Sequence, residues 1–318
     1  MKRAGWLLLA ALLAGGCGDD DGGAGDDDGG AGDDTDDGAD GSADAGAGAD
    51  AAAGVLDERP YELLVPDSYD ADTPTPLIVL LHGYTATGAV QLAYFGLADV
   101  AQEQGLLVAY PDGSVDGSGI HFWNATDACC DLSGSGVDDV AYLTAVMDDV
   151  AARYNVDPAR VLMVGHSNGG FMSHRMACDR ADRVAAIVSL AGATWADPAQ
   201  CQPSEPVAIL QVHGDADMTI LYAGGEILGN AYPAAADTVA SWAALNGCKG
   251  KLEASDTRLD IEEVIADDET RVDRTAGCPS PSAEVELWTI ETGSHVPSLL
   301  QPTWPETIVE FLLAHPKK

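Results

Sequence analysis

The chain has 318 residues, with 52 acidic side chains against 15 basic ones and a formal net charge of −37 at pH 7. A surface this acidic repels nucleic acid and other polyanions, so the composition excludes a nucleic-acid-binding protein. Net charge does not decide the fold, which the order of elements along the chain indicates.

The N-terminal 17 residues resemble an export signal. Lys2 and Arg3 precede an apolar run far shorter than the roughly 20 residues of a membrane-spanning helix. Small residues then lead to Cys17, as in a bacterial lipoprotein signal, although Ala14 stands where leucine is usual. We expect an exported protein with a lipid on Cys17, attached to a bacterial membrane or cell surface. The alternative is plain secretion after cleavage nearby.

Residues 18–53 are almost entirely Gly, Ala and Asp, with 13 acidic residues and no basic one. This composition has too little apolar surface to offset the entropy of ordering. We therefore expect a disordered acidic tether with an r.m.s. reach of roughly 30–36 Å. Calcium binding is the alternative, but the Asp spacing matches no EF-hand loop.

Residues 54–318 are long enough for one domain, in which strand-like and helix-like segments alternate. The apolar run 76–83, closed by a glycine, predicts a strand buried on both faces. Helical spacing predicts a helix at 137–155. Further strand-like runs lie at 106–113, 161–167, 184–193, 207–215 and 283–291. This order predicts an α/β fold with a mostly parallel central sheet flanked by helices.

Two features near the C-terminus stand apart from this alternation. Residues 247–282 are polar, and the stretch 262–274 favours a small hairpin. The last helix is expected to begin at Thr303, with Glu306 completing a capping box, and to run to about His315.

The sequence "GHSNG" at 165–169 lies between a predicted strand and a predicted helix. In that setting GxSxG is a nucleophile elbow, which lifts the serine hydroxyl above the carboxyl edge of the sheet. Gly165 and Gly169 are needed because side chains would collide across so tight a bend. The helix that follows Ser167 offers backbone N–H groups and a positive dipole end.

A serine nucleophile needs a base that is oriented by an acid. In this type of fold the acid and then the histidine follow the serine along the chain. Asp215 and Asp217 both follow the strand at 207–215 and are candidates for the acid. His295 lies in the loop after the last predicted strand and is the candidate base.

The other histidines receive no catalytic role from their positions. His82 and His213 each end a strand before a glycine and are expected to be structural. His166 is the variable position of the elbow, and His174 lies on the helix that follows.

Two backbone N–H groups are expected to form an oxyanion hole. One belongs to Asn168, directly after the serine, and the other to Tyr84, in the loop after the first buried strand. The Tyr84 ring, Trp123 and the neighbouring His121 are candidates to line the substrate pocket. The alternative for Tyr84 and His121 is an ordinary surface position.

Six cysteines remain when Cys17 is set aside, and an exported chain can form three disulfides from them. No metal site is expected, because no CxxC pair has a matching partner. A bond between the neighbours 129 and 130 would be strained. The expected pairs are Cys248–Cys278, Cys130–Cys178 and Cys129–Cys201.

The chain resembles the esterase/poly(3-hydroxybutyrate) depolymerase-like family, which is similar to feruloyl and acetyl xylan esterases. The motifs that carry the resemblance occur in the family's order: "LHGYTATG", "YPDGS", "WNATDACCD", "VDPARVLMVGHSNGGFMS", "HGDADMTI" and "GSHVP". They span about 60–315. The family's HGxxD pattern places the acid at Asp217, with Asp215 as the fallback. Some members carry a tryptophan after the histidine where this chain has Val296 and Pro297, which argues against a polymer-binding groove of that type.

The resemblance implies an α/β-hydrolase fold and a serine esterase without a cofactor. Its substrates would be carboxylic esters of the feruloyl, acetyl or short hydroxyalkanoate polyester type, cleaved through a Ser-His-Asp triad and an acyl-enzyme. The expected partners are therefore the ester substrate and, through the lipid alone, a membrane.

Two other functions share some of these patterns. A serine peptidase of the prolyl-oligopeptidase type also has GxSxGG and HGxxD, but normally carries a large N-terminal domain for which residues 18–53 leave no room. A non-catalytic surface lipoprotein usually lacks one triad residue, whereas all three candidates are present here.

Overall fold

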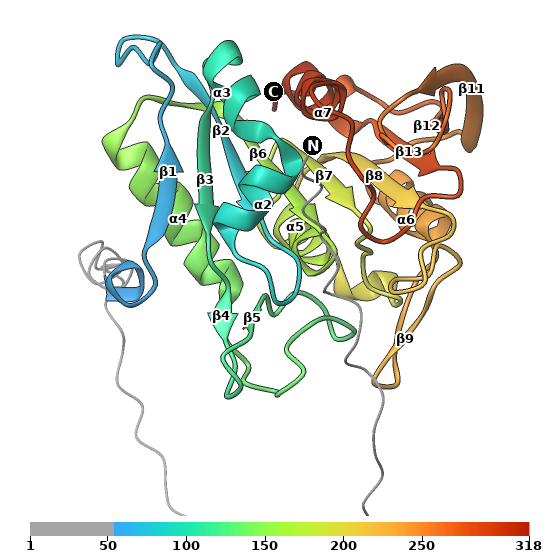
Figure 1. The fold of residues 1–318 in the computed structure, drawn as a ribbon, viewed down its shortest axis with the longest axis horizontal. Coiled ribbons are helices and arrows are strands. Elements are labelled where there is room, and N and C mark those ends of the chain that lie inside the picture. The colour runs from blue at the N-terminus through green and yellow to red at the C-terminus, as the bar shows by residue number, and fades with distance from the viewer. Residues whose placement is uncertain (1–53, 318) are drawn as a thin grey trace, which may run out of the picture. The chain divides into compact units, whose positions relative to one another are not determined.

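A computed structural model describes residues 54–317, in which one large sheet is the central layer (Figure 1). The expected signal segment 1–17, with Cys17, and the expected tether 18–53 lie outside the described residues. Between residues 54 and 317, none of the helices combines the length and the apolar character that a membrane crossing requires.

The large sheet of the described residues has nine strands, and six neighbouring strands from β3 to β13 run parallel. Antiparallel strands close both edges. The spatial order is β1 (Tyr61–Leu64), β3 (Leu107–Pro111), β2 (Thr75–Leu81), β6 (Val156–His166), β7 (Ala186–Leu190), β8 (Ala208–Gly214), β13 (Val285–Ile290), β12 (Thr270–Thr275) and β11 (Leu252–Leu259). The mostly parallel sheet predicted from the sequence is confirmed.

The helices cover the sheet from both sides and enclose two separate hydrophobic cores. On β2, Leu77, Val79 and Leu81 enter one core, and Ile78 and Leu80 enter the other, as the two-residue period of a strand requires. The first core also contains residues of α4 (Asp139–Arg153), α5 (Asn168–Asp179) and α6 (Ala235–Leu245); the second contains residues of α2 (Gly88–Phe95), α3 (Leu97–Gln104) and α7 (Thr303–Ala314).

Short elements extend from the carboxyl ends of the parallel strands, at the lower edge of the sheet in Figure 1. One is the ribbon of β4 (Ser114–Val115) and β5 (His121–Phe122), and another is the ribbon of β9 (Gly225–Ile227) and β10 (Asn230–Tyr232). The one-turn helix η1 (Pro198–Gln200) lies in the connection after β7, whereas η2 (Pro281–Ala283) directly precedes the amino end of β13.

The polar segment 247–282 forms a hairpin, but not where the sequence favoured it. β12 runs from Thr270 to Thr275, one residue past the expected stretch 262–274, whereas its partner β11 begins ten residues before that stretch, at Leu252. The reason is that β12 pairs with β13 along its other side, so the hairpin widens the central sheet instead of folding on itself.

The expected capping box of the last helix is wrong. Pro302 is the N-cap of α7 and no side chain caps the helix. The N–H of Glu306 donates to the Pro302 carbonyl at 3.2 Å, so Thr303 is already the first helical residue. Thr303 therefore lies one residue after the N-cap position, where its hydroxyl cannot cap the helix.

Cys248 is bonded to Cys278, the pairing expected from the sequence. The other two expected pairs, Cys130–Cys178 and Cys129–Cys201, are wrong, because Cys129 is bonded to Cys130 and Cys178 to Cys201. The end of α5 brings Cys178 to a Cα–Cα distance of 5.5 Å from Cys201, which is normal for a disulfide. Cys129 ends a tight turn of residues 126–129, whose end residues exchange N–H···O bonds of 3.1 and 2.7 Å, and the Cys130 N–H donates to the Trp123 carbonyl at 3.1 Å.

Candidate active site

Ser167 lies at the junction of β6 and α5, at the carboxyl edge of the sheet. Its backbone has φ 53° and ψ −119°, a conformation that residues with a side chain rarely adopt. A Cβ on Gly165 would lie 2.1 Å from the carbonyl oxygen of Gly169, and a Cβ on Gly169 would lie 2.2 Å from that of Leu81. The two glycines are therefore required by close backbone approach, as expected from the elbow motif.

The structure brings Ser167, His295 and Asp217 into one hydrogen-bonded row. The Ser167 Oγ is 2.9 Å from His295 Nε2, and His295 Nδ1 is 2.7 Å from Asp217 Oδ2. Asp217 follows β8 and His295 follows β13, which are adjacent parallel strands. Asp215, the fallback acid, is exposed and accepts a hydrogen bond from the Thr292 N–H at 2.6 Å instead.

The Asp217 carboxylate is buried but well supplied with donors. Its Oδ1 accepts the N–H groups of Thr219 and Ile220 at 2.8 and 2.9 Å. Burial raises the pKa of Asp217, but hydrogen bonds from His213, His295 and the Thr219 N–H outweigh burial and hold it well below its usual value. Because the carboxylate is charged, His295 carries its proton on Nδ1 and leaves Nε2 free to accept the serine proton.

The two expected oxyanion donors lie at this same edge. Asn168 is the first residue of α5, so its backbone N–H lies at the start of the helix. The fully buried Asn168 side chain forms hydrogen bonds with the backbone N–H and carbonyl of Trp123 at 2.7 and 2.9 Å. The Tyr84 N–H has no acceptor among the described residues. The His82 Nδ1–H donates to the Gly83 carbonyl at 2.8 Å, and in a trans peptide this orients the Tyr84 N–H the opposite way.

His82 is structural, as expected, and it joins the Tyr84 loop to the loop after β3. Its Nε2 accepts the Gly113 N–H at 2.8 Å. Burial lowers the pKa of His82 to about 4, so the ring is neutral and keeps this donor and acceptor pattern at neutral pH.

Two side chains form hydrogen bonds with backbone carbonyls of the loop that carries His295, and the sequence analysis did not predict these roles. The His166 Nε2–H donates to the backbone carbonyl of His295 at 2.8 Å, and the Tyr94 hydroxyl donates to that of Pro297 at 2.9 Å. Burial, then the neighbouring His295, lower the pKa of His166 to about 3, so His166 is neutral. The signal for His166 was its place at the end of the central strand, beside the serine.

The segment between β11 and β12 also forms hydrogen bonds with the loop that carries His295. The Ser298 N–H donates to Glu262 Oε1 at 2.8 Å, and the Ser298 carbonyl accepts the Glu263 N–H at 2.7 Å. The Leu300 N–H donates to the Ile261 carbonyl at 2.8 Å. The polar segment that interrupts the α/β alternation therefore supports the candidate base.

The expected pocket residues have different surroundings. Trp123 is wrong as a pocket residue, because it is fully buried between His82 and Tyr142 and its indole N–H donates to the His82 carbonyl at 3.0 Å. His121 is half-buried, and its backbone carbonyl accepts the Thr85 N–H at 3.0 Å. Tyr84 is half-buried beside the candidate oxyanion hole.

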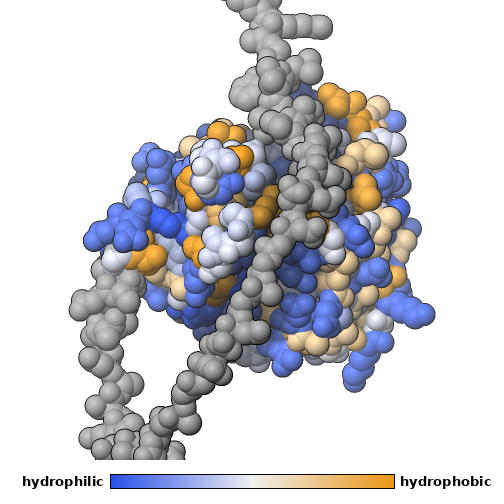
Figure 2. Space-filling view, turned by 90° about the horizontal axis from the view of Figure 1, so that it is seen from below, coloured by the Kyte–Doolittle hydropathy of each residue, from blue (hydrophilic) through white to orange (hydrophobic). Residues whose placement is uncertain are grey.

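Exposed apolar side chains flank two of the three central residues in sequence. Met218 follows Asp217 and is 84% exposed, and Val296 follows His295 and is 58% exposed. Figure 2 views the molecule from below, the side of the strands' carboxyl ends, and shows hydrophobic patches among hydrophilic ones. This edge can therefore meet an apolar group as well as a polar one.

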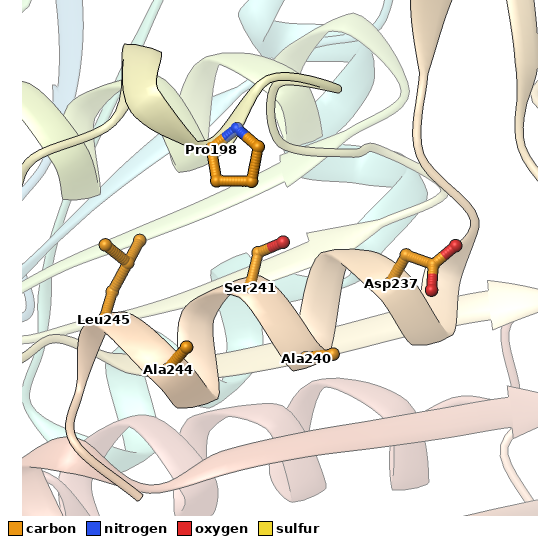
Figure 3. Close-up of a pocket in the computed structure, with 6 residues that line it drawn as sticks. All are labelled: Pro198, Asp237, Ala240, Ser241, Ala244 and Leu245. Carbon is orange, nitrogen blue, oxygen red and sulfur yellow. The ribbon is translucent and has the colours of Figure 1, made fainter.

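A separate groove of about 490 Å³ lies between η1 and α6 (Figure 3). Its lining residues are Pro198, Asp237, Ala240, Ser241, Ala244 and Leu245. None of them is a candidate site residue. In the part of the chain that the structure describes, no group of three or more His, Cys, Asp or Glu side chains is arranged to bind a metal ion.

Comparison with known proteins identifies the family and the fold of this chain. Residues 55–225, which include Ser167 and Asp217, match the family described as putative esterase. The chain belongs to this esterase family. The solved structures with similar folds include acetyl xylan esterase from Aspergillus awamori (TM-score 0.56, 16% identity, covering 79% of this chain and 93% of that one). They also include a thermostable esterase (TM-score 0.54, 15% identity, 81% and 60%). The predicted α/β-hydrolase fold is confirmed.

Curated relatives of this esterase-family chain are also named esterases. It is 33% identical over 142 residues to putative esterase NocK of Nocardia uniformis subsp. tsuyamanensis (45% of this chain, 40% of that protein). It is 28% identical over 194 residues to feruloyl esterase B of Piromyces equi (58% and 35%). It is 30% identical over 201 residues to probable feruloyl esterase C of Aspergillus flavus (61% and 64%). The chain thus spans between 35% and 64% of the length of these relatives.

Proposed function

We propose that this protein is a serine esterase that hydrolyses carboxylic esters with Ser167 as nucleophile, His295 as general base and acid, and Asp217 as the orienting acid. The observation that carries the proposal is the row of hydrogen bonds from the Ser167 hydroxyl through His295 to Asp217, at the carboxyl edge of the sheet. Membership of the esterase family supports the same reaction class.

In the acylation step, the Ser167 Oγ attacks the ester carbonyl carbon while His295 Nε2 takes the hydroxyl proton. The carbonyl oxygen becomes an oxyanion, for which the N–H groups of Asn168 and Tyr84 are the proposed donors. When the carbon–oxygen bond to the alcohol breaks, His295 returns the proton to the leaving alkoxide, and the acyl group stays on the serine.

In the deacylation step, a water molecule replaces the alcohol. His295 takes a proton from this water as it attacks the acyl carbonyl, and the same two N–H groups receive the second oxyanion. Collapse of this intermediate breaks the bond to Ser167 Oγ, which regains its proton from His295. The charged Asp217 stabilises the imidazolium in both steps.

We propose feruloyl, acetyl or short hydroxyalkanoate esters as the substrate class. The support is the naming of relatives as feruloyl esterases and the exposed apolar side chains of Met218 and Val296, which directly follow Asp217 and His295 in sequence. An aromatic or short aliphatic acyl group would bury part of this apolar surface on binding.

We further propose that the enzyme works outside the cytoplasm, tethered through a lipid on Cys17. The support is the sequence of residues 1–17 and the disulfides of the described domain, which are typical of oxidising compartments. A Cys17→Ser variant is expected to leave the membrane fraction. Its recovery with membranes as a processed, mature-sized species would contradict the anchor.

Hydrolysis of p-nitrophenyl acetate, compared with peptide anilides, tests the reaction class. The wild type is expected to cleave the ester and not the anilides, and Ser167→Ala to lose activity by several orders of magnitude. Ser189→Ala is the matched control, because Ser189 is also buried near the elbow but its hydroxyl has no partner among the described residues. Preferred cleavage of anilides would favour a peptidase, and equal activity of Ser167→Ala would refute the nucleophile. A panel of methyl ferulate, acetylated xylan and hydroxybutyrate oligomers then separates the substrate types.

A further inference from the structure

A row of buried hydrogen bonds runs from α6 to the Asp217 carboxylate. The indole N–H of Trp242 donates to Nδ1 of His174 at 2.9 Å. His174 Nε2 lies 2.9 Å from Gln211 Oε1, and Gln211 Nε2 lies 3.3 Å from His213 Nδ1. His213 Nε2 is then 3.3 Å from Asp217 Oδ2, the oxygen that also faces His295. We call Trp242, His174, Gln211 and His213 the Trp242 chain.

The first half of the Trp242 chain has only one possible direction. An indole nitrogen only donates, so His174 must accept on Nδ1 and carry its proton on Nε2. His174 therefore donates to the Gln211 oxygen. The Gln211 amide nitrogen also donates to the Gly192 carbonyl at 2.9 Å, which independently fixes the orientation of the amide.

In the second half of the Trp242 chain, the Ile220 carbonyl determines which ring nitrogen of His213 carries the proton. His213 Nε2 is 2.8 Å from the Ile220 carbonyl oxygen, which only accepts, so this nitrogen carries the proton. Nδ1 of His213 then accepts from the Gln211 amide. The Nε2–H of His213 therefore donates to the Ile220 carbonyl, and the same nitrogen lies 3.3 Å from the Asp217 carboxylate.

All four members of the Trp242 chain are buried, with at most 1% of any of them exposed. Water therefore does not compete for their hydrogen bonds, and reversing one bond would leave a buried group unpaired. The directions set by Trp242, by the Gly192 carbonyl and by the Ile220 carbonyl agree, so each member of the row has a single hydrogen-bonding role.

We propose that His213 is a positioning residue of the triad, and that the rest of the Trp242 chain supports it by helping to hold the Gln211 amide, whose nitrogen donates to His213 Nδ1. This inference rests on the proposed function. The Asp217 Oδ1 is held by two backbone N–H groups, so without His213 its Oδ2 would have only the catalytic imidazole as a partner. With His213 present, both oxygens of the Asp217 carboxylate have a partner other than His295.

Several titratable groups face this site and enter the expected pH dependence. They are His295 and His166 around Asp217, and Tyr222 and Tyr232 beside His213 and Asp217. Burial keeps the pKa of His166 low, at about 3, and raises that of Tyr232. Neither therefore titrates where a catalytic imidazole does, so a shift of the acidic limb of kcat/KM reports on the Asp217–His295 pair.

Variants of His213 test its role in the chemistry. His213→Leu removes the donor to Asp217, whereas His213→Gln keeps a nitrogen donor near the position of Nε2. We expect His213→Leu to lower kcat about 10- to 100-fold, the scale of losing a hydrogen bond to a charged group. The acidic limb of kcat/KM should move to higher pH, because a carboxylate with one donor fewer makes the pair easier to protonate. His213→Gln should recover most of both changes.

Trp242→Phe tests whether Trp242 affects catalysis through His174, Gln211 and His213. It keeps an aromatic ring but removes the donor that fixes His174, and a reduction of kcat with little change in KM is expected. Trp304→Phe is the matched control, because Trp304 is equally buried but its indole N–H has no partner among the described residues. Rates are expressed per site titrated with a fluorophosphonate, so that partial unfolding does not count as lost catalysis.

Nitrogen NMR of histidine-labelled wild-type protein gives a readout that does not depend on activity. We expect His174 and His213 both as neutral rings protonated on Nε2, and a shifted Nδ1 resonance of His174 in Trp242→Phe, which loses the hydrogen bond from the indole. A wild-type His213 protonated on Nδ1 would overturn the proposal. So would a His213→Leu enzyme with unchanged kcat per titrated site and an unchanged acidic limb. If His213→Leu does not fold, Trp242→Phe and the wild-type spectrum decide. A wild type inert toward esters and the fluorophosphonate would refute the proposed function, while the tautomers would still test the Trp242 chain.

Discussion

Replacing Asp217 with asparagine separates the charge of the candidate acid from its shape. Asp217 Oδ1 accepts the N–H groups of Thr219 and Ile220 at 2.8 and 2.9 Å, so the oxygen of the new amide must occupy this position. The amide nitrogen then takes the place of Oδ2, 2.7 Å from His295 Nδ1. A donor would face a donor, unless the imidazole moves its proton to Nε2.

A proton on Nε2 removes the acceptor that Ser167 needs. His295 Nε2 is 2.9 Å from the Ser167 Oγ, and in the new tautomer it can only donate to it. We therefore expect Asp217→Asn to lower kcat by roughly 10⁴-fold, or about 5 kcal/mol of transition-state stabilisation. The free energy of unfolding should change far less, because the two backbone hydrogen bonds persist.

Asp215→Asn is the matched control, since its side-chain oxygen can still accept the Thr292 N–H. We expect its kcat to stay within a few-fold of wild type. The assay is hydrolysis of p-nitrophenyl acetate at neutral pH, with rates expressed per folded protein measured by circular dichroism. A mild effect of Asp217→Asn together with a crippling effect of Asp215→Asn would refute the assignment of the acid.

Three further predictions concern stability and the N-terminal segment. Replacing Cys248 and Cys278 with alanine should cost about 3–4 kcal/mol of unfolding free energy, because the bridge closes a loop with a separation of 30 residues; denaturant titration with no loss would contradict this. Burial lowers the pKa of His315, but its hydrogen bonds to Glu284 and to the Phe311 carbonyl, together with the Glu284 charge, raise it more; the hydrogen bond from His315 also lowers the pKa of Glu284. The bond therefore stabilises most between the unfolded values of about 4.3 and 6.5 and is lost at higher pH, so Glu284→Gln should cost about 1 kcal/mol near pH 5.5 and much less near pH 8.5, and equal losses would contradict it. Deleting residues 18–53 should leave kcat/KM on soluble esters unchanged, and a large loss would give this segment a role in turnover.

The parallel sheet and the elbow could be predicted because their signals are local. The continuous apolar run at 76–83 reflects burial on both faces, and Gly165 and Gly169 are required by the bend around Ser167. The order of serine, acid and histidine along the chain was enough to select His295, and the HGxxD pattern chose Asp217 over Asp215.

The remaining features depend on contacts between distant segments, which periodicity does not report. The pairing of Cys178 with Cys201 depends on where α5 ends relative to a loop more than 20 residues away. Trp123 was expected to line the substrate pocket together with the neighbouring His121, yet the side chain of Asn168 holds its backbone against α5 and its ring is buried. The partners of His213 are Gln211, Asp217 and Ile220, on β8 and the loop after it, but the way this loop folds back onto the strand is not reported by periodicity. The position of His213 before a glycine therefore indicated only a structural role.

Mass spectrometry of the protein after reaction with a fluorophosphonate tests the central claim most directly. We expect one stoichiometric adduct on the peptide that contains Ser167, formed with loss of p-nitrophenyl acetate hydrolysis and absent from Ser167→Ala. Ester hydrolysis that persists without labelling of Ser167, or an adduct on a different serine that accompanies the loss of activity, would contradict it.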